Sequence, residues 1–447
     1  MSQKIRCSAG QTCRLLSPRP IIERVTTFRA LRSRNYRLFF TGQGISVIGT
    51  WMTRLATSWL VYRLTESPFL LGLVGFVEQI PSLFLSPLAG VWVDRWNRHR
   101  TIVTTQIASM VQSFLLAALA LTGTINISWI IALSLMQGII QAIEVPARQA
   151  FVIQMVENRA DLSNAIALNS SIFNMGRLVG PAIAGIVVAA VGEGWCYFID
   201  GVSYLAVIIS LLSMKLHRIV NKSEKREILH ELAEGWSYIL SSPALRWILL
   251  MLGLISLFGL PFTTLLPIMA GTVFSGGPHT LGFLMAAMGL GAFTCAVTLA
   301  LRKSVRGLGK WLAIAATTLG ISLILFGLLK ILWVSLVLMF CAGFGMMQQI
   351  VTSNTILQTI VADDKRGRVM SYYALALFGF MPIGSLLAGT LASRIGTPQT
   401  LMLEGAFCLL AAVWFWGRLD EVRRAIRPIY IEMGLIPNPE VAVDGPN

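Results

Sequence analysis

Stretches of about 20 apolar residues recur along almost the whole chain, and each is long enough to cross a bilayer as a helix. The composition agrees, because 55% of the residues are hydrophobic, 13% are charged and the mean hydropathy is +0.70. Soluble domains carry roughly 25% charged residues, so we predict an all-α integral membrane protein. The expected spans are 38–62, 69–92, 101–122, 127–147, 165–190, 195–214, 247–270, 280–300, 311–328, 332–352, 369–391 and 397–417.

The distribution of Lys and Arg predicts how these spans are oriented. Cytoplasmic flanks hold an excess of cationic residues. Of the 36 Lys and Arg, five lie inside spans or after odd-numbered spans, which leaves 31 on the other side. We therefore expect both termini in the cytoplasm of a bacterium, with the basic N-terminal tail against an anionic leaflet of the inner membrane. This topology explains the charge of +15 without a nucleic-acid partner, and the tail lacks the apolar region of a signal peptide.

The chain repeats itself at an offset of 204 residues. The matched residues are Gln154 and Gln358, Gly180 and Gly384, Ala184 and Ala388, Gly185 and Gly389, and Gly192 and Gly396. Chance is the alternative, since Gly and Ala are common in membrane helices. An offset that holds over some forty residues favours two pseudo-symmetric six-helix halves, which run in parallel and can rock about a central site.

The expected organisation has two membrane halves and three cytoplasmic segments. They are a basic tail at 1–34, the N-terminal half at 35–214, a linker at 215–246, the C-terminal half at 247–417 and a tail at 418–447. In the linker one helical face collects Ile228, Leu229, Leu232, Trp236, Ile239 and Leu240. This pattern predicts a helix on the membrane surface. A solvated linker helix is the alternative, but it leaves Trp236 unexplained.

Residues for catalysis or metal binding are sparse. The histidines at 99, 217, 230 and 279 fall in expected loops, and the chain has no HExxH, GxSxG or phosphate-binding P-loop motif. The six cysteines form no CxxC pair, so we expect neither structural disulfides nor a metal cluster. We predict that the protein is not an enzyme and needs no cofactor or metal. A membrane sensor is a further alternative, but it would be expected to carry an extra soluble domain.

A specific charge pattern, GVWVDRWNRHR, lies between the second and third spans. It resembles the G-x-x-x-D-R-x-x-R-x-R/K signature of the major facilitator superfamily, here as Gly90, Asp94, Arg95, Arg98 and Arg100. The resemblance implies a twelve-helix transporter in which this turn latches the halves together against the start of the eleventh span. A carboxylate at a helix N-terminus would form such a contact. An incidental Asp in a basic loop is the alternative.

Two further motifs resemble the same superfamily. GRLVGPAIAG matches the antiporter motif G-x-x-x-G-P-x-x-G-G through Gly176, Gly180, Pro181 and Gly185, with Ala184 in place of one glycine. Small residues at this spacing permit close helix packing, so a kinked packing helix is the alternative. In the fourth span, SLMQGIIQA resembles R-x-x-Q-G-x-x-x-A, but Ser134 stands where the resemblance places an arginine linked to proton coupling.

Charged residues inside spans are candidates for the transport cavity, because each costs about 2.5 to 3.5 kcal/mol at a helix centre. Arg54 and Glu78 are expected at one depth, and we predict that they pair. The alternative is that Arg54 extends outward to the interface. Arg177 lies mid-span and needs a partner, for which the candidates are Glu144, a substrate anion or helix carbonyls.

Other polar residues complete the expected site. The further cavity candidates are Gln141, Gln348, Gln349 and Asn354. Because Pro146 is expected to end or bend the fourth span near the cytoplasm, Glu144 and Arg148 are assigned to the latch. Asp200 and Glu404 come early in their spans, so we expect both near the outer surface without a special role.

Longer segments resemble one branch of the superfamily, the enterobactin-exporter branch. They include SVIGTWMTRLATSWLVYRLT, NAIALNSSIFNMGRLVGPAIAG and GRVMSYYALALFGFMPIGSLLAG. The resemblance implies a monomeric secondary transporter in the lipid bilayer that exports a siderophore or drug-like amphiphile in exchange for protons. A lysophospholipid or lipid facilitator without proton coupling is the alternative of the same class.

Overall fold

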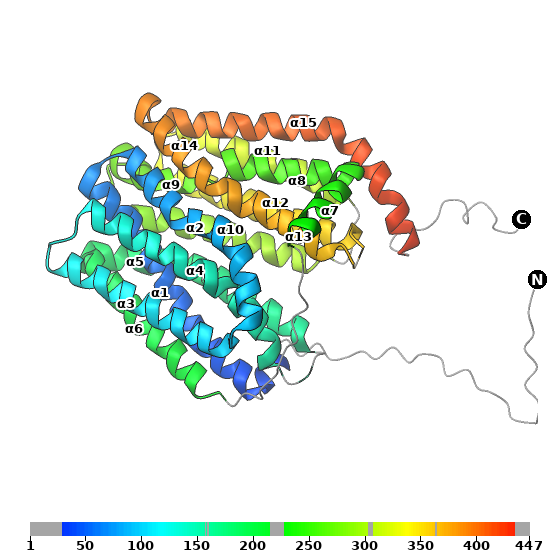
Figure 1. Ribbon diagram of the computed structural model, residues 1–447. Helices are drawn as coiled ribbons and strands as arrows, with labels where there is room; N and C mark the ends of the chain where they lie inside the picture. The colour runs from blue at the N-terminus through cyan, green and yellow to red at the C-terminus, as the bar shows by residue number, and fades with distance from the viewer. Residues whose placement is uncertain are drawn as a thin grey trace, which may run out of the picture.

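The computed structural model describes residues 29–156, 158, 161–214, 228–302, 307–362 and 364–433, and all regular elements within these ranges are helices (Figure 1). Within these ranges, side chains are not described for some residues at the end of α2 and the start of α7. The first six spanning helices are α1 (Arg34–Thr65), α2 (Pro68–Arg95), α3 (Arg98–Leu121), α4 (Ile127–Met155), α5 (Leu162–Val191) and α6 (Glu193–Leu212).

The second half also crosses the bundle six times, but two of its spans are interrupted. The seventh combines α8 (Pro243–Phe258), α9 (Phe262–Ile268) and the π-helical turn η3 (Met269–Val273). The eleventh combines α13 (Arg366–Ala374), the π-helical turn η4 (Leu375–Gly379) and α14 (Phe380–Ile395). The others are α10 (Pro278–Ala300), α11 (Leu308–Leu328), α12 (Leu332–Ile360) and α15 (Thr397–Glu432). The expected all-α fold of two six-helix halves is confirmed.

Eleven segments of the described chain are long and apolar enough to span a membrane. The more polar α1 packs against α5 and α6 and is counted as the twelfth span.

Two helices extend beyond their expected ends. Pro146 does not end α4, which continues to Met155. Neighbouring helices can satisfy the backbone groups that a proline frees, so a membrane helix tolerates it. Likewise, α15 continues past the expected boundary at 417 to Glu432.

Polar caps and glycines define the short turns between spans. Asn97 Oδ1 accepts a hydrogen bond from the Arg100 amide at the start of α3, and Asn126 Oδ1 accepts one from the Trp129 amide at the start of α4. Gly192 and Gly396, one of the pairs in the repeat, have φ values of 91° and 92° and join α5 to α6 and α14 to α15. Side chains with a Cβ rarely adopt this conformation, so both halves use the same glycine turn.

Two glycine contacts join the halves. A Cβ placed on Gly282 of α10 would lie 3.0 Å from the Cα of Gly185 on α5, and one placed on Gly72 of α2 would lie 3.0 Å from the Cα of Gly389 on α14. Such approaches exclude any larger residue. Gly185 and Gly389 are partners in the repeat. We call these contacts the α5–α10 seam and the α2–α14 seam, and both lie at the end of the bundle away from the start of α1 and the end of α15 (Figure 1).

The linker forms a helix, α7 (Ile228–Ser241), that contacts the start of the eleventh span. The Trp236 ring lies 5.6 Å from the Tyr372 ring, and Glu234 forms an ion pair with Arg368 of α13. Ile239 is buried, whereas the side chains of residues 228–232 lie outside the described part of the chain. Trp236 therefore holds the linker helix against the C-terminal half.

Candidate functional site

Two arginines flank a tryptophan at the centre of the N-terminal half. The guanidinium of Arg54 lies 5.1 Å from the centre of the Trp51 ring, and that of Arg177 lies 5.2 Å from it. Close packing of α5 on α1 produces this geometry, because a Cβ placed on Gly180 would lie 2.5 Å from the Cβ of Trp51. The motif glycines therefore bring Arg177 to the aromatic ring that Arg54 also contacts, and cation–π contacts of this kind stabilise both charges.

Arg54 also approaches the one acidic residue proposed for this region. Its Nη2 lies 3.7 Å from Glu78 Oε1 of α2, and the two side chains are 44% and 22% exposed. A Cβ on Gly138 of α4 would lie 2.2 Å from the Glu78 carbonyl oxygen, so this glycine fixes the position of the Glu78 backbone. The structure thus brings together the pair expected from the sequence, and its role in transport stays a prediction.

We expect the Arg54 and Glu78 pair to add little to stability. Pairs exposed to this degree typically contribute about 0.2 to 1 kcal/mol. Unfolding of the Arg54→Gln, Glu78→Gln and double variants in detergent should therefore yield a coupling energy in that range. A coupling energy of zero would show that the charges do not interact in the folded protein.

Arg177 lacks an acidic partner within the described ranges. Its Nη1 is buried and has no hydrogen-bond partner there. Glu144, one of the candidates for this role, instead accepts a hydrogen bond of 3.1 Å from Arg148 Nη1. A Cβ on Gly289 of α10 would lie 2.8 Å from the Arg177 carbonyl oxygen, which places Arg177 where the halves meet. Arg177 is thus a cation at the junction of the halves that contacts Trp51 and has no acidic partner among the described residues.

The remaining polar candidates for the cavity, three on α12 and one on α4, differ in whether their side chains have hydrogen-bond partners. Gln348 donates a hydrogen bond of 2.9 Å to the Trp311 carbonyl of α11, so its amide joins two helices of the same half. Gln349 is buried, and neither atom of its amide has a partner in the described part of the chain. Asn354 accepts a hydrogen bond from Gln358, and Gln141 is half-buried on α4. Gln349 is thus the more suitable of the two adjacent glutamines for binding a ligand.

The latch can be followed only in part. The surroundings of Gly90 and the side chains of Asp94 and Arg95 are not described, so the contact of this turn with α13 stays a prediction. Arg98 Nη1 donates to the Ala150 carbonyl of α4 at 3.5 Å. The Arg148 guanidinium lies 4.6 Å from the Phe173 ring of α5. Arg98 and Arg148 therefore connect helices within the N-terminal half.

The antiporter-type motif lies in the interfaces of α5. A Cβ on Gly176 would lie 2.4 Å from a side-chain carbon of Val47, so Gly176 packs on α1 together with Gly180. Across the α5–α10 seam, a Cβ on Gly282 would lie 2.8 Å from the Pro181 carbonyl oxygen. One motif thus joins α5 to a helix of its own half and to a helix of the other.

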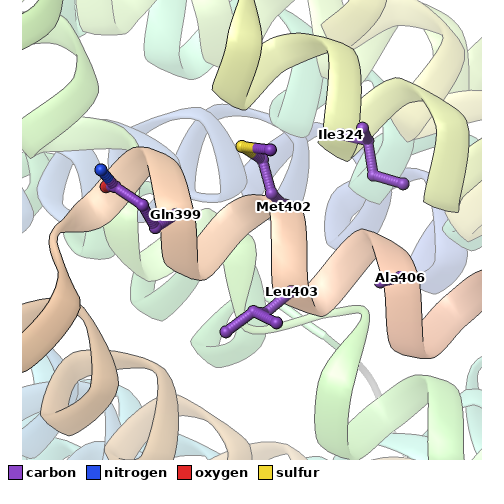
Figure 2. A pocket seen from close by; sticks show the side chains of 5 residues that line it. All are labelled: Ile324, Gln399, Met402, Leu403 and Ala406. Carbon is purple, nitrogen blue, oxygen red and sulfur yellow. The ribbon is translucent and has the colours of Figure 1, made fainter.

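Two cavities lie along α15, in the C-terminal half. One of about 380 Å³ lies between α11 and α15, lined by Ile324, Gln399, Met402, Leu403 and Ala406 (Figure 2). A second of about 240 Å³ lies among α8, α14 and α15, and Arg394 and Glu404 line it. The first is almost wholly apolar and suits an acyl chain better than a charged substrate.

Sequence reasoning gave no role to three residues, Trp51, Asp200 and Glu404. Trp51 was not selected. Asp200 and Glu404 were expected near the outer surface without a special role, and the structure buries both side chains, which are 1% and 5% exposed. Their separation of 204 residues equals the repeat offset, so the repeat was the signal that could have identified them as a pair.

Comparison with known proteins places this architecture in a family. The family described as "Transmembrane secretion effector" matches residues 25–430. The chain is 28% identical to the "Staphyloferrin A transporter" of Staphylococcus aureus, over 86% of this chain and 96% of the relative. It is 25% identical to the "Enterobactin exporter EntS" of Shigella boydii, over 87% of this chain and 92% of the relative.

Solved structures agree on the fold. A bacterial homologue of the human lysosomal transporter Spinster, in an inward-facing and occupied conformation, has a TM-score of 0.69 and 14% sequence identity. The match covers 89% of this chain and 98% of that chain. The chain is therefore a multi-pass membrane transporter of the efflux type, and it belongs to the transmembrane secretion effector family of the major facilitator superfamily.

Proposed function

We propose that the protein exports a small amphiphile with an anionic group, either a siderophore or a drug-like molecule, across the bacterial cytoplasmic membrane in exchange for protons. The observation that carries this proposal is Arg177, a cation at the junction of the halves without an acidic partner among the described residues. A charge in this position is costly unless it is neutralised. A carboxylate or catecholate of the substrate supplies the negative charge that Arg177 lacks. A ring of the substrate packs against the Trp51 ring beside it.

Alternating access follows from the two seams. With both termini in the cytoplasm, the α5–α10 and α2–α14 seams close the outer end, so this conformation receives substrate from the cytoplasm. Binding at Arg177 then favours separation of the seams and release outward. In the outward-open state, the turn around Asp94 holds the cytoplasmic ends of the two halves together. Rocking of two six-helix halves about a central site provides both movements.

The proposal is tested in inside-out membrane vesicles that carry the native protein. When acidification of the lumen imposes a proton gradient, a labelled catecholate siderophore should accumulate in the vesicles, and a protonophore should abolish the accumulation. Vesicles without the protein are the control. Entry of label that does not respond to the gradient would favour the facilitator without proton coupling, and absence of protein-dependent entry would contradict siderophore export.

A further inference from the structure

A second polar site lies inside the N-terminal half, away from the arginines. Asp200 of α6 is 1% exposed, and its Oδ2 accepts hydrogen bonds of 2.9 Å from Thr53 of α1 and 2.9 Å from Ser113 of α3. Its Oδ1 is buried and has no hydrogen-bond partner in the described part of the chain. A Cβ on Gly49 would lie 2.7 Å from that atom, so the glycine leaves the room it occupies. The Ser203 hydroxyl also lies beside this carboxyl, which is buried and has no cationic partner among the described residues.

The same arrangement recurs one helical turn along α6. The Tyr204 hydroxyl lies beside the hydroxyls of Thr50 on α1 and Ser109 on α3. A helix rises about 5.4 Å per turn, so Tyr204 forms the next polar layer after Asp200. Tyr204 also interacts electrostatically with Glu144 of α4, which is buried beside Arg148. These groups lead from Asp200 toward the end of the bundle that carries the termini.

Unsatisfied polar atoms mark the same three-helix interface. Gln43 on α1 and Gln106 on α3 are buried, and neither side-chain oxygen has a partner among the described residues. Buried polar groups without a protein partner normally bind water. Helices that only pack against each other or face lipid do not need such groups, so the interface of α1, α3 and α6 is unusually polar.

We propose that Asp200 is the proton-binding residue of the exchange, and that the polar groups of α1, α3 and α6 conduct its proton. The inference rests on the proposed transport function and names the coupling residue for it. In each cycle one proton adds to a carboxylate oxygen of Asp200 from the outer side and is later released toward the cytoplasm. Only that O–H bond forms and breaks, and no oxidant or reductant takes part.

α1 connects the proton site to the substrate site. Thr53 donates to Asp200, the next residue Arg54 approaches Glu78, and Trp51 lies against Arg177. Protonation of Asp200 neutralises the acceptor of the Thr53 and Ser113 hydrogen bonds, which weakens the attachment of α1 to α6. Charged acceptors form hydrogen bonds roughly twice as strong as neutral ones. Substrate binding and protonation therefore act on the same helix.

Within the described ranges, the groups that interact directly with Asp200 are uncharged side chains. Thr53 of α1 and Ser113 of α3 face it as neutral donors, and Tyr204 and Cys196 interact with it from its own helix. Arg54 and Arg177 lie against Trp51 instead. About two helical turns earlier on α6, Glu193 pairs with Arg63 at 2.9 Å. No arginine or lysine of the described chain forms an ion pair with Asp200.

The test separates coupling from transport in proteoliposomes by following entry of a labelled catecholate siderophore, with unlabelled siderophore inside for counterflow and empty proteoliposomes for accumulation. Counterflow without a proton gradient measures transport, and accumulation driven by an imposed gradient measures coupling. We expect Asp200→Asn to retain counterflow and to lose gradient-driven accumulation. The control is Glu404→Gln, which changes the repeat-related buried carboxyl and should retain both activities. Gradient-driven accumulation by Asp200→Asn at the native level would overturn the proposal.

Two further measurements keep the proposal falsifiable if Asp200→Asn does not fold or if no substrate is found. Thr53→Val with Ser113→Ala removes the donors to the carboxylate from α1 and α3. Because these donors favour the charged form, their loss should move the pH midpoint of driven accumulation upward while counterflow persists. Infrared titration of the reconstituted native protein needs no substrate. It should show a carboxyl band that titrates and disappears in Asp200→Asn but not in Glu404→Gln, and its persistence in Asp200→Asn would contradict the assignment.

Discussion

Replacement of Arg177 by alanine is expected to weaken substrate binding by about 10- to 150-fold. This range corresponds to the loss of one hydrogen bond to a charged group, about 1.5 to 3 kcal/mol, at 1.4 kcal/mol per tenfold change in Kd. Arg177→Lys should fall between native and Arg177→Ala, because lysine keeps the charge but loses the two-pronged geometry of the guanidinium. Equilibrium binding of the labelled siderophore to purified protein measures the effect.

Thermal stability distinguishes this role of Arg177 from a structural one. A buried cation without a partner is unfavourable, so Arg177→Ala should unfold at a temperature no lower than that of the native protein. The control is Arg63→Ala, which removes the 2.9 Å pair with Glu193 at the far end of the bundle and should leave Kd unchanged. Native affinity in Arg177→Ala, or a large loss of stability, would contradict the proposed site.

Bulky residues in the seams should shift the equilibrium between closed and open seams by a factor similar to the loss of affinity expected for Arg177→Ala. Gly185→Leu places a side chain where a Cβ alone would lie 2.9 Å from the Pro278 carbonyl oxygen, and Gly389→Leu does the same 2.5 Å from the Pro68 carbonyl oxygen. Overpacking costs about 1 to 3 kcal/mol, which corresponds to about a 5- to 150-fold shift away from the closed seam. Each variant should therefore favour the outward-open state and slow counterflow.

The shift can be measured as a distance between spin labels at Thr124 and Ser393, which are exposed at that end of the two halves. We expect a longer distance in both seam variants. Gly44→Leu is the matched control, since a Cβ at Gly44 would meet no atom within 4 Å. An unchanged distance in Gly185→Leu and Gly389→Leu would show that the seams do not control access.

The fold and the central charges could be predicted because they depend on local pattern and depth. Apolar length fixes the spans, and the repeat relates Gly185 to Gly389 and Gly192 to Gly396. Arg54 and Glu78 lie at similar depths from their shared turn, which is why their approach at 3.7 Å could be anticipated. These inferences need only the rise of a helix and the thickness of a bilayer.

Contacts that depend on helix rotation could not be predicted. Trp51 becomes part of the site only because Gly176 and Gly180 bring α5 onto α1. Asp200 looked peripheral from its distance along α6, but rotation of that helix directs it toward Thr53 and Ser113. For the same reason Gln348 is directed to α11 and not toward the other half. A sequence gives the order and depth of such residues but not the direction in which each helix faces.

The most direct test of the account is counterflow of a labelled catecholate siderophore into proteoliposomes that contain the native protein and an excess of unlabelled siderophore. The account predicts saturable, transient accumulation of label that liposomes without protein do not show. Accumulation should be strongly reduced by Arg177→Ala and retained by Arg63→Ala. Label that enters native proteoliposomes no faster than protein-free liposomes would contradict the claim that the protein carries an anionic amphiphile across the membrane.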